Sequence, residues 1–179
     1  MRRVSVVGNS GSGKSTLARA LAARLALPCV ELDAIFHQPG WTELPVEEFR
    51  AQAAEAAAGD AWVIDGNYSA VRDLVWGRAD SVVWIDLPRP EVMRRVVTRT
   101  VRRALRRQEL WNGNREPWSN FLTLDPERSI IMWAWTQHAK YRARYEAAMA
   151  DPAWAHLRFI RLRSPADVRT FLARPLRTS

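Results

Sequence analysis

Short apolar runs alternate along the chain with stretches in which apolar residues recur every three or four positions. The short runs are typical of buried strands, and the longer periodic stretches are typical of helices. Five strands are predicted: Arg2–Val7, Cys29–Leu32, Ala61–Ile64, Ser81–Ile85 and about Leu157–Leu162. Strands that alternate with helices indicate an α/β fold on a mainly parallel sheet. We therefore expect a five-stranded parallel sheet flanked by helices.

The predicted helices differ in length and in surroundings. They cover about Lys14–Leu25, Val46–Ala58, Pro90–Arg107, Pro126–Ala150 and Pro165–Leu172. The segment between the fourth and fifth strands is longer than a plain crossover requires, and its residues 111–117 are polar and turn-prone. We interpret this segment, at about residues 103–125, as a helical lid insertion within a single domain of residues 1–179.

Charge and composition narrow the classes of partner. The chain has 27 basic and 19 acidic residues, a net charge of +8, which favours anionic partners such as nucleotides, phosphorylated metabolites or nucleic acid. Many arginines can also be simply solvated, so charge alone does not choose among these partners.

The only cysteine, Cys29, excludes an intrachain disulfide, and its apolar neighbours predict that it is buried. No apolar run approaches the length of a signal-peptide core or a membrane span, so we expect a cytoplasmic protein without a membrane partner.

The most specific motif lies between the first predicted strand and the first predicted helix. It reads Gly-Asn-Ser-Gly-Ser-Gly-Lys-Ser over residues 8–15, the pattern of a phosphate-binding P-loop. Glycines let backbone N–H groups surround phosphate oxygens, Lys14 adds a positive charge at the β- and γ-phosphates, and Ser15 offers a hydroxyl to Mg²⁺. The sequence therefore predicts a P-loop NTPase fold that binds ATP and Mg²⁺. The predicted nucleotide-binding residues here are Gly8, Ser10, Gly11, Ser12, Gly13, Lys14, Ser15 and Thr16.

Three aspartates follow predicted strands, at the edge where parallel sheets bind ligands. Asp65 comes after Trp62–Ile64 and before a glycine, so we expect it to complete the metal site with Ser15. Asp33 precedes a polar and aromatic loop and is a candidate to accept the proton of a substrate hydroxyl. We expect Asp86 to have a structural capping role.

Arginines are concentrated in the predicted helix before the lid. Phosphoryl transfer needs cations that neutralise the moving group, and lid arginines are suited to supply them. One face of the helix carries Arg95, Arg99 and either Arg102 or Arg103, whereas Arg94 and Arg107 turn away. Arg99, and Arg115 in the lid loop, are the predicted catalytic cations, although many of these arginines can instead form a solvated helix face.

Longer strings extend these motifs into a resemblance that covers nearly the whole chain. The strings are GNSGSGKST (8–16), LDAIFHQPGW (32–41), WVIDGNYS (62–69), ADSVVWIDLPR (79–89) and ELWNGNRE (109–116). The chain resembles the adenylate kinase-like P-loop kinases, and most closely the DNA topology-modulation proteins among them. The resemblance implies a five-stranded parallel sheet, a mobile lid and ATP-dependent phosphoryl transfer. It also implies that Arg95 and Arg99 contact adenine and phosphates, and that the turn at Arg163 and Ser164 cradles adenine.

Departures from this family bear on the phosphoryl acceptor. The arginine that adenylate kinases carry four residues after the aspartate matching Asp65 is Ser69 here, and Arg72 is the nearest alternative. Asp33 instead resembles the substrate-binding aspartate of shikimate kinase, which favours a hydroxyl acceptor over a nucleoside monophosphate. The leading hypothesis is a small-molecule kinase with Lys14, Asp33, Arg99 and Arg115 as its catalytic residues. The alternative is an ATP-binding, DNA-associated protein without small-molecule kinase activity.

Overall fold

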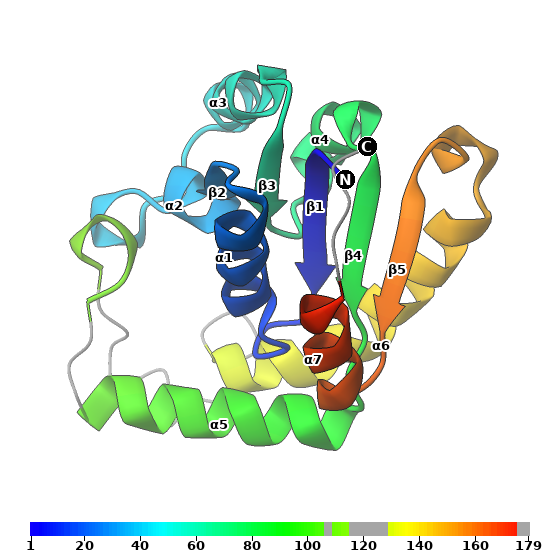
Figure 1. Ribbon diagram of the computed structural model, residues 1–179. Helices are drawn as coiled ribbons and strands as arrows, with labels where there is room; N and C mark the ends of the chain where they lie inside the picture. Colours follow the sequence, from blue (N-terminus) through cyan, green and yellow to red (C-terminus); the bar gives the residue numbers. More distant parts are fainter. Residues whose placement is uncertain (106–108, 115–128, 175–179) are drawn as a thin grey trace.

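The computed structural model describes residues 1–105, 109–114 and 129–174. Its five strands form one parallel sheet in the order β2-β3-β1-β4-β5 (Figure 1). The strands are β1 (Arg3–Gly8), β2 (Cys29–Glu31), β3 (Trp62–Asp65), β4 (Ser81–Ile85) and β5 (Arg158–Leu162). This architecture confirms the predicted fold class of a five-stranded parallel sheet flanked by helices.

Helices cover both faces of the sheet and its carboxyl edge. The α-helices are α1 (Lys14–Leu25), α2 (Leu32–Phe36), α3 (Val46–Ala58), α4 (Arg72–Arg78), α5 (Arg89–Leu105), α6 (Ile130–Ala150) and α7 (Pro165–Ala173). Short 3₁₀ turns are η1 (Pro39–Trp41), η2 (Ser69–Val71), η3 (Trp111–Gly113) and η5 (Pro152–Trp154). In Figure 1, α5 passes below the points of the strand arrows, where parallel strands bind ligands. None of the helices among the described residues has the length and apolarity needed to cross a membrane.

Two hydrophobic cores lie on opposite faces of the sheet because strand side chains alternate. In β1, Val4 and Val6 pack in the cluster that contains α1, α5 and α7 residues, whereas Val7 joins the cluster with α3 and α4. The register pairs Val6 with Asp65 and Gly8 with Ile85, so the phosphate loop and Asp65 leave the sheet at the same edge.

Three local predictions differ from the structure. The second strand ends at Glu31, and Leu32 begins α2, so Asp33 lies in the first turn of a helix rather than directly after a strand. An acidic residue is favourable there because of the helix dipole. Cys29 is exposed, since β2 is an edge strand that pairs only with β3. The long helix begins at Ile130, with Ser129 as its cap, and residues 126–128 of the prediction lie outside the described residues.

Candidate active site

The phosphate loop, residues 8–15, curls between β1 and α1 with α5 packed directly against it. Gly11 has a φ of +77°, in the left-handed region, and a Cβ placed there would lie 2.2 Å from Cγ2 of Val96. Only glycine therefore allows the loop and α5 to approach this closely. The N–H of Ser12 donates to the carbonyl of Asn9 at 3.1 Å, which closes the turn before α1.

Asn67 holds the start of the phosphate loop in place. Its Oδ1 accepts from the N–H of Gly8 at 3.0 Å, and its Nδ2 donates to the carbonyl of the same glycine. The hydroxyl of Tyr145 donates to Asn67 Oδ1 at 2.9 Å and so fixes the amide. Sequence reasoning did not assign Asn67 a role; the signal was its place two residues after Asp65, beyond the end of a buried strand.

Asp65, Ser15 and Lys14 come together at the carboxyl end of β3. Asp65 is buried, its side chain is hydrogen-bonded to Ser15, and its Oδ1 has no hydrogen-bond partner. Burial raises the pKa of Asp65 to about 6, the Lys14 charge opposes this rise, and the charges of Asp33 and Glu31 add to it. A buried carboxylate with an unused oxygen therefore faces the place where the phosphate loop would hold phosphates.

These groups fit a magnesium ion that is bound together with ATP. Mg²⁺ favours oxygen ligands and is often held by one or two protein groups plus substrate phosphates. The Ser15 hydroxyl and the unused oxygen of Asp65 are such groups. Over the described ranges, no three His, Cys, Asp or Glu side chains gather into a metal cluster of their own. Thr16, the next residue after Ser15, is exposed.

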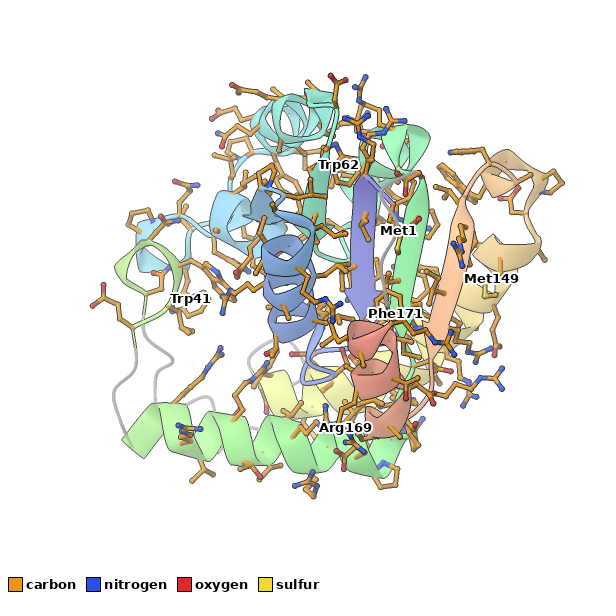
Figure 2. All side chains as sticks on the ribbon, viewed as in Figure 1. Met1, Trp41, Trp62, Met149, Arg169 and Phe171 are labelled. Carbon is orange, nitrogen blue, oxygen red and sulfur yellow. The ribbon has the colours of Figure 1, made fainter. Side chains whose placement is uncertain are left out.

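Two arginines of α5 reach the phosphate loop. Arg95 Nη1 donates to the Ser12 carbonyl at 3.2 Å, and Arg99 Nη2 donates to Ser10 Oγ at 3.1 Å. Arg94 is exposed, and both it and Arg95 pair with Glu91. Figure 2 shows nitrogen-tipped side chains along α5, the helix at the strand ends. Arg95 and Arg99 of the predicted face thus lie at the loop, whereas Arg115 lies outside the described residues.

A second polar cluster surrounds Asp33. The hydroxyl of Tyr68 donates to Asp33 Oδ1 at 2.7 Å and lies 3.4 Å from Nε2 of His37. Burial and the Asp33 charge raise the pKa of Tyr68 above its ordinary value, so this hydroxyl remains a donor at neutral pH. Tyr68 thereby orients the Asp33 carboxylate and leaves its second oxygen for another partner. The sequence pattern gave no contact between these residues, which are 35 positions apart.

Residues 109–114 of the predicted lid dock beside Asp33. The Trp111 ring stacks on His37 with centroids 6.3 Å apart, and its Nε1 donates to Glu31 Oε2 at 3.0 Å. Asn114 is buried; it donates to the Gln38 carbonyl and accepts from the N–H of Trp41. Figure 2 shows Trp41 on this side of the molecule. Residues 109–114 therefore form one wall of the Asp33 cluster.

Other candidate residues have structural contacts. The Asp86 carboxylate forms an ion pair with Arg161 at 2.5 Å, which is a structural contact of another kind than the cap predicted for this residue. Ser164 caps α7: its Oγ accepts from the N–H of Asp167 at 3.1 Å. The N–H groups of Arg163 and Ser164 both donate to the Asp167 carboxylate, so an adenine contact at this turn stays a prediction.

Comparison with solved structures places this site on a known fold. Shikimate kinase from Bacteroides thetaiotaomicron superposes with a TM-score of 0.56 at 17% identity, over 96% of this chain and 94% of the other. Shikimate kinase from Acinetobacter baumannii, solved with shikimate, gives 0.56 at 17% identity over 96% and 91%. A gluconokinase from Sinorhizobium meliloti gives 0.50 at 19% identity over 96% and 91%. The chain shares the fold of these P-loop kinases. No protein-family model and no curated protein matches its sequence.

Proposed function

We propose that the protein transfers the γ-phosphoryl group of ATP to a hydroxyl of a small molecule. The observation that carries this proposal is the pair of carboxylates at the carboxyl edge of the sheet. Asp65 lies against Ser15 and Lys14 of the phosphate loop. Asp33 is oriented by the hydroxyl of Tyr68, and its negative charge is near enough to Asp65 to raise the pKa of Asp65. In this proposal Asp65 acts at the phosphate-binding part of the site, and Asp33 acts on the phosphoryl acceptor.

Each residue has a distinct task in this proposal. Mg²⁺-ATP, when bound, supplies the phosphoryl group, and the metal offsets its negative charge. Lys14 and the loop N–H groups hold the phosphates, while Ser15 and Asp65 hold the metal. Arg99, anchored at Ser10, lies where it can neutralise charge on the moving group. The free oxygen of Asp33 accepts the proton of the attacking hydroxyl.

The structural neighbours support a hydroxyl rather than a phosphate as acceptor. Their names describe kinases of shikimate and gluconate, which are hydroxylated carboxylic acids. Asp33 also matches the substrate-binding aspartate of the shikimate kinase pattern in the sequence. A phosphate acceptor would have no proton to give up, and the Asp33–Tyr68 pair would then have no chemical task.

The test is ADP release from Mg²⁺-ATP with shikimate, gluconate, AMP or duplex DNA as the second component. We expect a hydroxylated acceptor to raise ADP release and Asp33→Asn to lower kcat about 100-fold or more. Asp60→Asn, at an exposed aspartate, is the matched control and should leave kcat unchanged. Stimulation by AMP alone or by DNA alone would contradict the proposal, as would full activity of Asp33→Asn.

A further inference from the structure

Two asparagines next to the predicted lid loop hold α2, the short helix that carries Asp33, and the loop that follows it. We infer that Asn112 and Asn114 are positioning residues for phosphoryl transfer, because they fix the backbone that presents Asp33 to the acceptor. The inference rests on the proposed function and adds to it the residues that set the geometry of the acceptor side.

The helix α2 is too short to be stable by itself. It has five residues, and the N–H of His37 closes its turn by donating to the Asp33 carbonyl at 3.0 Å. Isolated helices of this length are marginal in water, and the last carbonyls of any helix have no partner within it. Contacts from outside α2 must therefore keep Asp33 in place.

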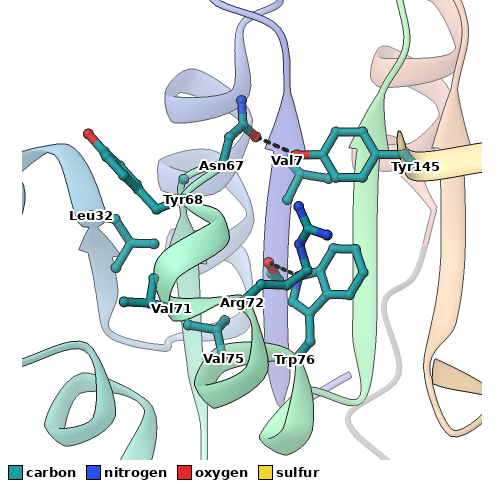
Figure 3. A pocket seen from close by; sticks show the side chains of 11 residues that line it. Val7, Leu32, Asn67, Tyr68, Val71, Arg72, Val75, Trp76 and Tyr145 are labelled. Carbon is teal, nitrogen blue, oxygen red and sulfur yellow. Dashed lines mark hydrogen bonds between the residues drawn. The ribbon is translucent and has the colours of Figure 1, made fainter. Parts of the chain in front are cut away.

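The amino end of α2 is fixed by packing. Leu32 is buried and lines a small pocket together with Tyr68 (Figure 3). The backbone of Gly66 approaches so closely that a Cβ there would lie 2.8 Å from Leu32. This apolar contact fixes the start of the helix, but it offers no hydrogen bond to the carbonyl groups at the other end.

The amide of Asn112 supplies hydrogen bonds to the carboxyl end of α2. Its Nδ2 donates to the carbonyl of Ala34 at 3.1 Å and to the carbonyl of His37 at 2.6 Å. Asn112 has a φ of +55°, in the left-handed region that asparagine adopts more readily than most residues. The residue before it, Trp111, donates its Nε1–H to Glu31, which directly precedes α2. Two consecutive residues therefore contact both ends of the helix.

Asn114 holds the loop that follows α2. Its buried side chain donates to the Gln38 carbonyl at 2.9 Å and accepts from the N–H of Trp41 at 3.0 Å. Trp41 has a φ of +60°, a strained conformation for a bulky residue, and such conformations persist only where the surroundings hold them. The Trp41 ring meets His37 edge-on, with centroids 5.4 Å apart. Asn114 therefore sets the position of a ring that packs on His37.

These contacts converge on the surroundings of Asp33. Nε2 of His37 lies 3.4 Å from the Tyr68 hydroxyl, and this hydroxyl donates to Asp33 at 2.7 Å. A shift of α2 would move Asp33 relative to Tyr68, which follows β3 and not α2. Misplacement of a reacting group by about 1 Å can lower turnover about 100-fold. Loss of either asparagine amide should therefore lower kcat while ATP binding is retained.

The direct test is amide hydrogen exchange, followed by NMR on the full-length, ATP-free protein. One reporter is the N–H of His37, which donates to the Asp33 carbonyl and measures the opening of α2. The other is the N–H of Trp41, which donates to Asn114 and measures the opening of the loop. The N–H of the buried Phe49, near the start of α3, serves as the internal reference.

The variants remove one amide at a time. Asn112→Gly deletes the side chain and keeps a residue that tolerates the left-handed backbone, so it isolates the hydrogen bonds from backbone strain. We expect it to speed exchange at His37 about fivefold or more, and Asn114→Ala to do the same at Trp41. Gln52→Ala, which removes an exposed amide from α3, is the matched control and should leave both rates unchanged.

Kinetics separates positioning from a general loss of structure. With whichever of shikimate or gluconate raises ADP release, Asn112→Gly and Asn114→Ala should each lower kcat about tenfold and change the KM for ATP less than about twofold. In an Asp33→Asn background neither change should lower kcat further, because the group that the asparagines position is then absent. Gln52→Ala should leave kcat unchanged in both backgrounds.

The outcomes distinguish this inference from the proposed function. Unchanged exchange at His37 and Trp41 would overturn the hold on α2, and an equal rise at Phe49 would show a global loss of structure instead. Faster exchange with a wild-type kcat, or a further tenfold loss of kcat in the Asp33→Asn background, would overturn the positioning role. If exchange responds as expected but no hydroxylated acceptor raises ADP release, the hold on α2 stands and the kinase proposal fails.

Discussion

The contact between the phosphate loop and α5 gives a prediction whose size follows from the structure. Gly11→Ala places a methyl group 2.2 Å from Val96 Cγ2, about 1.3 Å closer than carbon atoms normally approach. Overpacking of this kind costs about 1–3 kcal/mol. An alanine at φ +77° adds about 1–2 kcal/mol of backbone strain, so the total is about 2–5 kcal/mol.

Gly40 is the matched control for backbone strain. Its φ is +72°, close to that of Gly11, but a Cβ at Gly40 would meet nothing within 4 Å. Gly40→Ala should therefore cost only the strain, about 1–2 kcal/mol. Urea unfolding of both variants measures the difference, which we expect to be about 1–3 kcal/mol. Equal destabilisation of the two variants would refute the close contact between the loop and α5.

The same substitution tests how α5 positions its arginines. A displaced α5 would move Arg95 and Arg99 away from the loop, so Gly11→Ala should weaken ATP binding about tenfold and Gly40→Ala should not. Val96→Ala removes the clashing methyl group. The double variant of Gly11 and Val96 should therefore be less destabilised than the sum of the single variants by about 1 kcal/mol or more. Additive effects would show that the clash is not the cause.

Three further predictions concern individual side chains of the site. Arg95→Gln should raise the KM for ATP about tenfold, because Arg95 contacts the phosphate loop, whereas Arg94→Gln at its exposed neighbour should change this KM less than about twofold. Steady-state kinetics measures both values, and similar KM values for the two variants would contradict the prediction. Tyr68→Phe should lower kcat about tenfold with little change in the KM for ATP, because Asp33 loses the hydroxyl that donates to it. An unchanged kcat would argue against an orienting role of Tyr68. In the folded protein the pKa of Asp65 is about 6, above its ordinary value of 3.8. Between these two pH values folding takes up a proton, so the stability of the wild type falls as the pH rises from about 4 to about 6. Asp65→Asn should therefore be more stable than wild type by about 1–3 kcal/mol at pH 7, should lose this advantage near pH 4, and should lose turnover. Urea unfolding at both pH values tests the stability effect. A stability advantage that is independent of pH would contradict it.

The sheet was predictable because its signal is local. Val82–Ile85 is apolar at every position and Val4–Val7 is apolar apart from Ser5, as expected for strands buried on both faces. The P-loop motif is also local, since its glycines, lysine and serine are contiguous. These runs located the carboxyl edge of the sheet and, with it, the position of Asp65 beside Ser15.

The acceptor side was less predictable because it depends on contacts between distant residues. Tyr68 meets Asp33 across 35 positions, and Asn67 meets Gly8 across 59. Periodicity carries no information about such pairs. The helix at Leu32–Phe36 was also missed, because five residues are too few for a helical pattern to appear. Arg72 was noticed from its position, but its contact with the Trp76 ring is visible only once the fold is known.

The central claim is that the phosphate loop drives phosphoryl transfer to a small hydroxylated acceptor. The most direct measurement is acceptor-stimulated ADP release from Mg²⁺-ATP by wild type, Lys14→Ala and Lys140→Ala. Lys140 is the only other lysine in the chain and is exposed on α6, which makes it the matched control. The account predicts that the stimulation disappears in Lys14→Ala and persists in Lys140→Ala. Stimulation that survives Lys14→Ala, or a wild type that responds to no small acceptor, would contradict the claim.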